Sequence, residues 1–246
     1  RHQAFTSVMR ALGGQGKASF VLAGHQALHR ATSEPGHPLR NFGEVLRLGP
    51  LDLEAAQQMI VEPLTALGLR FADEAAAVHF LRTQTGCRPH LLARLCVAIC
   101  NLPQSFGPQA LTLAEIQQTA QSRSFLFESF GRDWTVMAPL ERALVRLALL
   151  QPGSRREDLL ASLHDQGTPL SAQQLEECLD HLYAWHYALI PDEEGRLYCP
   201  VPLLSFWLTD LRPELTGGHL FASAELRLRG DFTSDLLAHH SSDGPL

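Results

Sequence analysis

Three groups of residues in this 246-residue chain have types and spacings that could support chemistry. The first, residues 12–19, reads Leu-Gly-Gly-Gln-Gly-Lys-Ala-Ser and is similar to part of a phosphate-binding loop. Such a loop needs glycine, four residues and then Gly-Lys-Ser/Thr, placed between a strand and a helix. Here Ala11 stands where the first glycine should be, and Ala18 follows Lys17. We therefore interpret residues 12–19 as a turn from a helix to a strand.

The second group is Cys87-Arg88-Pro89-His90, which lies where a helix is expected to begin because proline favours the first helical position. The N-terminus of a helix presents unpaired N–H groups and the positive end of the helix dipole. Together with a neighbouring arginine, such an end favours anions. Arg88, Pro89 and His90 are therefore candidate anion-binding residues.

The third group consists of residues that could bind a metal or act as nucleophiles. Two pairs are spaced four apart, so that each could share one helix face: His25 with His29, and Cys96 with Cys100. Zinc needs further ligands nearby, and the sequence offers no convincing set beside either pair. Ser154, His164 and Asp165 lack the Gly-x-Ser-x-Gly elbow of a serine nucleophile. We therefore predict no metal site and no catalytic residue in this chain.

The composition indicates a globular protein of about two domains. The chain is 45% hydrophobic and 19% charged, and its net charge of −6 gives no general attraction to nucleic acid or anionic membranes. Five scattered cysteines favour a reducing cytoplasm over a disulfide framework. The best apolar run, residues 91–100, is interrupted by Arg94 and is too short to span a membrane. No signal peptide opens the sequence, whose first residues read as the middle of a helix, so we expect it to begin inside a longer protein.

Residues 1–48 are expected to form one helix and two strands. Apolar residues recur at helical spacing and end at a Gly-Gly pair: Phe5, Val8, Met9 and Leu12. The runs 20–24 and 44–48 read as short buried strands of a parallel sheet. Two such strands cannot bury both of their faces, so this segment requires partners that the sequence does not contain.

Residues 49–122 are expected to be all helical, and residues 123–212 to combine helices with one hairpin. Helix starts are indicated at Asp52, Asp73, Pro89 and Thr112, the last with Glu115 in a capping box. After a connector helix, we expect helices over 139–150, 156–164 and 171–187, a hairpin over 189–199 and a closing helix over 203–211. Three helices followed by a hairpin are typical of a winged helix. Residues 213–246 lose this periodicity and are expected to form a loosely ordered tail.

The charges of the expected winged helix disfavour nucleic acid. Its third helix carries Glu176, Glu177 and Asp180 and no Arg or Lys. Residues 134–210 contain five Arg against eleven Asp and Glu, a net charge of −6. Because binding to duplex DNA depends on cations that neutralise phosphates, contact with nucleic acid is not expected.

In this order, the elements resemble the C-terminal part of STAND-type AAA+ ATPases, which are related to the archaeal and origin-recognition ATPases. Members of that family carry a strand ending in Ala-Gly, a strand followed by Pro-Leu and Glu-Ala, a Thr-Gly-Gly-x-Pro turn followed by Leu-Leu, and a winged helix ending in Trp-Leu. The matching positions are 20–24, Gly49-Pro50-Leu51 with Glu54-Ala55-Ala56, Thr85-Gly86 with Pro89-His90-Leu91-Leu92, and Trp207-Leu208. The match covers roughly residues 1–212 and is carried by the order and spacing of these motifs.

The resemblance implies a mainly α fold with a small β part. Residues 1–48 would be the last strands of a parallel α/β ATPase core, residues 49–122 a helical lid and residues 123–212 a winged helix. The core is incomplete, because the sequence holds neither a phosphate-binding loop nor the acidic strand that binds Mg²⁺.

The resemblance also implies which residues approach a nucleotide. The lid turn places Arg88, Pro89 and His90 near it, Gly24 precedes a sensor position, and Arg40 lies in a loop that relatives present to a neighbouring subunit. ATP or ADP with Mg²⁺ would be held by an N-terminal half, and this chain alone would hold no cofactor. Cys87 replaces the second glycine of the turn, which often has a positive backbone angle, so its Cβ is expected to shift the turn.

The leading hypothesis is therefore the regulatory half of a nucleotide switch. The lid would sense the nucleotide, and the winged helix would mediate autoinhibition or contacts with protein partners, with nucleotide-dependent oligomers. The alternative from another class is a DNA-binding winged-helix regulator or transposition-type factor. A third alternative is a scaffold module without catalysis. The choice depends on residues and their chemistry, because a fold alone does not determine a function.

Overall fold

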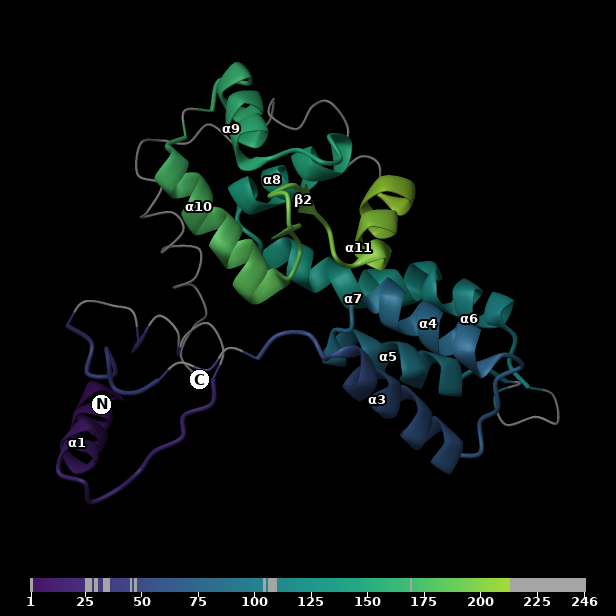
Figure 1. Ribbon diagram of the computed structural model, residues 1–246, viewed down its shortest axis with the longest axis horizontal. Coiled ribbons are helices and arrows are strands. Elements are labelled where there is room, and N and C mark those ends of the chain that lie inside the picture. The colour runs from purple at the N-terminus through teal and green to yellow at the C-terminus, as the bar shows by residue number, and fades with distance from the viewer. Residues whose placement is uncertain are drawn as a thin grey trace. The chain divides into compact units, whose positions relative to one another are not determined.

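The computed structural model describes residues 2–24, 28, 31–32, 36–44, 46, 48–103, 105, 110–168 and 170–212. These residues are mainly helical, and their single sheet has two strands. The chain divides into two compact units, Arg1–Leu48 and Gly49–Leu246, and each is described by itself (Figure 1). None of the described helices is both long and apolar enough to cross a membrane. The expected tail, residues 213–246, lies outside the described residues.

The first unit is organised around helix α1 (His2–Gly14), which ends at the Gly-Gly pair as expected. Met9, on its apolar face, is buried. Arg10 reaches from α1 to the following loop, where its Nη1 donates to the carbonyl oxygens of Pro38 at 2.9 Å and of Arg40 at 2.7 Å. These two hydrogen bonds hold the loop against the helix.

The two strands predicted in this unit are absent from its described residues, which corrects that part of the expectation. Residues 20–24 have no regular structure, and neither have Glu44 and Leu46. Val21 and Leu48 are both 98% exposed, so these runs do not line a core. The physical reason is that a short parallel strand persists only when neighbouring strands pair with it and helices cover its faces.

In the first half of the second unit, the described residues form four helices. Their bounds are α3 (Leu53–Ala66), α4 (Glu74–Thr85), α5 (Pro89–Cys100) and α6 (Leu113–Ala120). The predicted caps are present, since Asp52 accepts the N–H of Ala55 at 2.7 Å and Asp73 accepts the N–H of Ala76 at 2.9 Å. Each of these side chains satisfies a backbone donor that the first turn of a helix leaves unpaired. Helix α5 packs against α3, α4 and α6.

The second half joins further helices to the hairpin. Its elements are α7 (Arg123–Val136), α8 (Pro139–Leu150), α9 (Arg156–Asp165), α10 (Ala172–His181), η1 (Leu182–His186), β1 (Ile190–Pro191), β2 (Leu197–Tyr198), α11 (Pro202–Phe206) and η2 (Trp207–Leu211). The helix predicted over 139–150 is confirmed with those bounds. The helix predicted over 171–187 is α10 continued by η1, a π-helical turn.

The hairpin is short and is fixed at its turn and at its base. Strands β1 and β2 are antiparallel, with Ile190 opposite Tyr198 and Pro191 opposite Leu197. The N–H of Leu197 also donates to the carbonyl oxygen of Ser154 at 2.8 Å, which ties the hairpin to the segment between α8 and α9. At the turn, Gly195 has a φ of 77°, a conformation that glycine adopts without steric cost.

The helices of both halves share one hydrophobic core. A single cluster of buried side chains runs from Ala56 in α3 to Leu208 in η2. The cluster includes a group of aromatic rings in which Trp207 lies 6.0 Å from Phe130 and 6.1 Å from Trp134, measured between ring centroids. Helix α7 therefore packs against α11 and η2 as well as against α5 and α6.

Candidate functional site

The turn between α4 and α5 joins two of the four sequence motifs on which the resemblance rests. The N–H of Cys87 donates to the carbonyl oxygen of Arg82 at 3.1 Å and the N–H of Gly86 to that of Thr83 at 3.3 Å, which is the hydrogen-bond pattern of a Schellman cap. The N–H of Leu51 donates to the carbonyl oxygen of Cys87 at 3.0 Å. The Gly49-Pro50-Leu51 segment is therefore hydrogen-bonded to the turn that begins α5.

Two consecutive residues of this turn have left-handed backbone angles. Gly86 has a φ of 59° and Cys87 a φ of 54°. For a residue with a Cβ this conformation costs about 1–2 kcal/mol. Cys87 thus keeps the backbone angle that a glycine would favour, and the turn forms in spite of its side chain.

Arg88 lies at the N-cap of α5, and its surroundings come from the second half of the unit. The guanidinium is partly buried, and it is within electrostatic range of Asp133 in α7, Cys199 beyond β2 and Tyr187 beyond η1. Burial lowers the pKa of Arg88 from its ordinary value, while the carboxylate of Asp133 opposes that shift. An arginine stays protonated in either case, so Arg88 presents a cation to Asp133.

The other predicted site residues lie at the surface. Pro89 and His90 are exposed in the first turn of α5 beside Arg88. Gly24 and Arg40 are exposed residues of the first unit, whereas the α5 turn belongs to the second unit. His25, at the expected sensor position, lies outside the described residues, as does its partner in spacing, His29.

A buried polar cluster of three side chains lies in the same half of the unit as Asp133. Glu141, the third residue of α8, has a side chain that is 0% exposed. Its Oε2 accepts the N–H of Ala138 at 2.7 Å, and its Oε1 is hydrogen-bonded to His181 Nδ1. His186 Nε2 lies 3.9 Å from Glu141 Oε2, and the two imidazole rings meet edge to face with centroids 5.5 Å apart. We call these three residues the Glu-His-His cluster.

The protonation states within the cluster are set by burial and by the neighbouring charges. Burial lowers the pKa of His186 to about 4, although the charge of Glu141 opposes this shift. Burial also works against ionisation of Glu141, but the hydrogen bond and charge of His181, followed by the charge of His186, lower the pKa of that carboxyl. At neutral pH the cluster therefore holds an ionised carboxylate and a neutral His186 imidazole.

The sequence pattern does not reveal this cluster, because the two histidines do not have α-helical spacing. His181 and His186 are five residues apart, which in an α-helix places them about 140° from each other. The π-turn η1, in which the N–H of Tyr187 donates to the carbonyl oxygen of Leu182, brings them to one face. Glu141 carries a signal only as a capping residue in the third position of α8, and that position alone does not predict burial.

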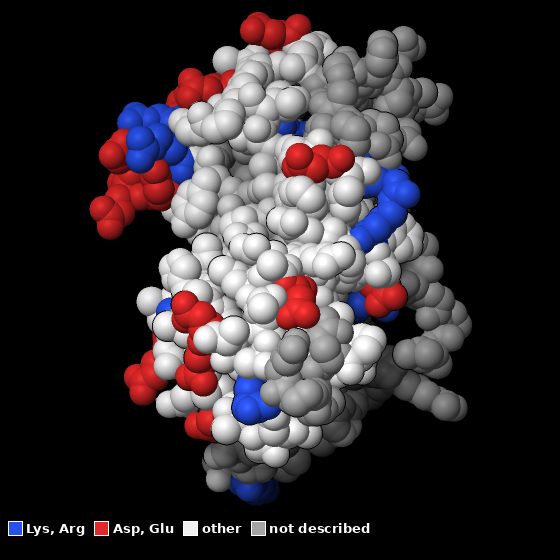
Figure 2. All heavy atoms as spheres, turned by 90° about the vertical axis from the view of Figure 1, so that its right-hand side faces the viewer, with Lys and Arg blue, Asp and Glu red and all other residues white. Residues whose placement is uncertain are grey.

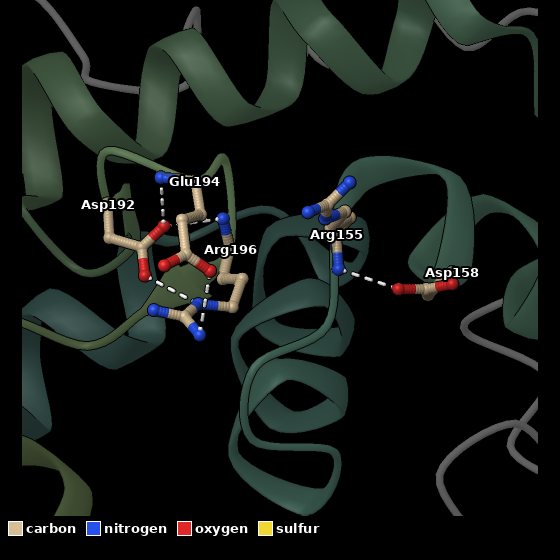
Figure 3. Close-up of polar contacts among 5 residues, drawn as sticks. All are labelled: Arg155, Asp158, Asp192, Glu194 and Arg196. Atoms are coloured by element: carbon tan, nitrogen blue, oxygen red, sulfur yellow. Dashed lines mark hydrogen bonds and ion pairs between the residues drawn. The ribbon is translucent and has the colours of Figure 1, made fainter.

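Three charged side chains of the hairpin turn, those of Asp192, Glu194 and Arg196, are paired with one another. Asp192 accepts the N–H groups of Glu194 and Arg196, and its Oδ2 accepts Arg196 Nε at 2.7 Å (Figure 3). Arg196 Nη1 also lies 3.0 Å from Glu194 Oε2. On the face drawn in Figure 2, the coloured basic side chains are interspersed with acidic ones and form no broad positive patch. Arg196, the cation of the hairpin turn, thus forms ion pairs with carboxylates of the same turn.

No family model, no curated protein and no solved structure matches this chain in the three comparisons. Its function is therefore argued from its residues.

Proposed function

We propose that this chain is the regulatory half of a STAND-type AAA+ nucleotide switch. In this proposal, α3–α6 form the lid over ATP or ADP with Mg²⁺ held by an N-terminal phosphate-binding half. Residues 123–212 form a winged helix that holds the resting state or contacts protein partners. The single observation that carries the proposal is the hydrogen bond from Leu51 to Cys87, because it joins two of the four motifs of the resemblance at the start of α5.

The α5 turn has the features of a nucleotide sensor. The N-cap of α5 is not capped by a side chain, so the N–H groups of the first turn remain donors for an anion. Arg88 adds a cation at the same place, and its electrostatic partner in this arrangement is Asp133. A nucleotide phosphate brought to this turn would compete with Asp133 for Arg88.

The turn is also in direct contact with the second half of the unit. The backbone of Gly86 packs on that of Pro200, so closely that a Cβ at Gly86 would lie 2.6 Å from the Pro200 carbonyl oxygen. Helix α4 packs against α11. A displacement of the turn therefore has to move the segment that follows the hairpin. A nucleotide that binds one arrangement of the turn more tightly shifts the population toward that arrangement.

The test is nucleotide binding by the full-length protein, measured with fluorescent ATP and ADP analogues. Arg88→Ala should weaken binding by about tenfold, the usual effect of losing one charged hydrogen bond to a phosphate. Arg123→Ala, at an exposed position in the first turn of α7, is the matched control and should bind as the parent does. The proposal fails if the full-length protein binds neither ATP nor ADP.

The contacts made by the proposed winged helix are expected to be with proteins. Its hairpin arginine is paired internally, and residues 134–210 carry a net charge of −6. Tyr183 and Tyr198 are 50% and 46% exposed on η1 and β2, and exposed tyrosines are common at protein interfaces. Fluorescence anisotropy with duplex DNA at low salt should show no binding. Salt-dependent binding would instead support the DNA-binding alternative.

A further inference from the structure

The Glu-His-His cluster offers three potential metal ligands from two different segments of the chain. One carboxylate oxygen of Glu141 and one ring nitrogen from each of His181 and His186 all lie within 4.8 Å of one another. Around a tetrahedral zinc ion with bonds of about 2.0–2.1 Å, ligand atoms lie about 3.3 Å apart. Small side-chain rotations therefore suffice to bring the three atoms around one ion.

An unsatisfied nitrogen points into this cluster. His186 Nε2 is buried and has no hydrogen-bond partner among the described residues. The carboxylate oxygen that it faces is 3.9 Å away, beyond hydrogen-bond distance. Buried polar atoms are usually paired, because an unpaired one has lost its water and gained nothing in exchange. A cation between His186 and Glu141 would give this nitrogen a partner.

Charged groups of both signs lie near the cluster. Asp133 and Arg88 are both within electrostatic range of His186, and the carboxylate of Asp133 offsets part of the charge that a dication would bring into the interior.

We propose that Glu141, His181 and His186 bind a late first-row divalent metal ion, with Zn²⁺ as the physiological occupant. Two imidazoles and one carboxylate match the ligand preference of zinc, whereas Ca²⁺ and Mg²⁺ select oxygen ligands. The fourth position is open to water. The ion links the start of α8 to the end of α10 through the π-turn. This inference is independent of the nucleotide switch.

The experiment uses the whole chain and measures Co²⁺ and Zn²⁺ binding. Co²⁺ should give the visible absorption of a tetrahedral or five-coordinate site, and a single equivalent of Zn²⁺ should abolish it. His186→Phe keeps an aromatic ring of similar shape and removes the unpaired nitrogen, so it should fold without metal. It should nevertheless bind Zn²⁺ at least about tenfold more weakly and lose the Co²⁺ spectrum.

The controls separate this cluster from other histidines. His79→Phe, at an exposed position in α4, should keep the affinity and the Co²⁺ spectrum of the parent. His181→Gln is a second cluster variant and should lose both. Metal binding that is unchanged in His186→Phe and His181→Gln would overturn the proposal. So would the absence of any Co²⁺ spectrum in the parent, because the cluster would then be a hydrogen-bonded network alone.

Discussion

Cys87 is a residue in a backbone conformation that glycine adopts without steric cost. Its φ of 54° follows the left-handed Gly86, and its thiol is buried against the turn. Cys87→Gly and Cys87→Ala both remove the sulfur, but only the glycine variant removes the Cβ. We therefore expect Cys87→Gly to be about 1 kcal/mol more stable than Cys87→Ala, as measured by urea unfolding.

In a helix, glycine should be less stable than alanine, which provides a control for the Cys87 variants. Ala161 is exposed in the interior of α9, where glycine costs about 1 kcal/mol relative to alanine. Ala161→Gly should therefore lower stability. If Cys87→Ala were as stable as Cys87→Gly, the turn would carry no strain from its Cβ.

Cys96 illustrates how burial controls thiol chemistry. Burial raises the pKa of Cys96 from the ordinary 9.0 to about 12, and the charge of Cys100 adds to that shift. Only the thiolate reacts with iodoacetamide. Raising the pKa of Cys96 from 9.0 to about 12 therefore lowers its thiolate fraction at pH 8 by about a thousandfold. Peptide mapping by mass spectrometry should find Cys96 unmodified in the native protein and alkylated in urea. Equal rates in the two conditions would contradict the raised pKa.

At the scale of elements, local signals predicted the helices and their ends. Asp52, Asp73 and Thr112 cap helices as expected, since each signal acts within one turn of the chain. The strands over 20–24 and 44–48 failed because a strand depends on partners that lie elsewhere in space. The Glu-His-His cluster was missed for a similar reason: a π-turn and a burial pattern, neither of them signalled locally, bring its members together.

The α4–α5 turn and the segment after the hairpin can be tested as one packed element. Gly86→Ala introduces a Cβ at a φ of 59° and 2.6 Å from the Pro200 carbonyl oxygen. The backbone penalty is about 1 kcal/mol, and the clash adds to it, so we expect a loss of about 3 kcal/mol in the free energy of unfolding.

Gly153→Ala is the matched control for that variant. Gly153 also has a positive φ, of 83°, but the nearest atom to its Cβ would be 3.9 Å away. It should show the backbone penalty without the clash. Equal destabilisation by the two variants would show that contact with Pro200 contributes nothing.

At the scale of the whole molecule, the continuous core predicts that the second unit unfolds cooperatively. Trp207 is 2% exposed and packs on Phe130 and Trp134 of α7. Trp207→Ala should cost about 3–5 kcal/mol, because a large aromatic side chain leaves a cavity. Hydrogen exchange should then accelerate together in α5 and in α10, although Trp207 belongs to neither.

Phe127→Ala removes an aromatic ring that is 58% exposed on the same helix, α7, and should cost less than about 1 kcal/mol. Exchange that accelerates in α10 alone after Trp207→Ala would show that residues 49–122 and 123–212 open separately. The expected domain boundary at residue 122 would then separate two parts of the chain that unfold independently.

The π-turn lets two histidines that are five residues apart share one face. If the same residues formed an α-helix, the second imidazole would lie about 140° from the first, and only one of the two would face Glu141. Losing one residue between the histidines together with the π-turn would instead leave a spacing of four, which shares a face in an α-helix. The cluster therefore depends on a match between the spacing of the histidines and the winding of the helix, as much as on the histidines themselves.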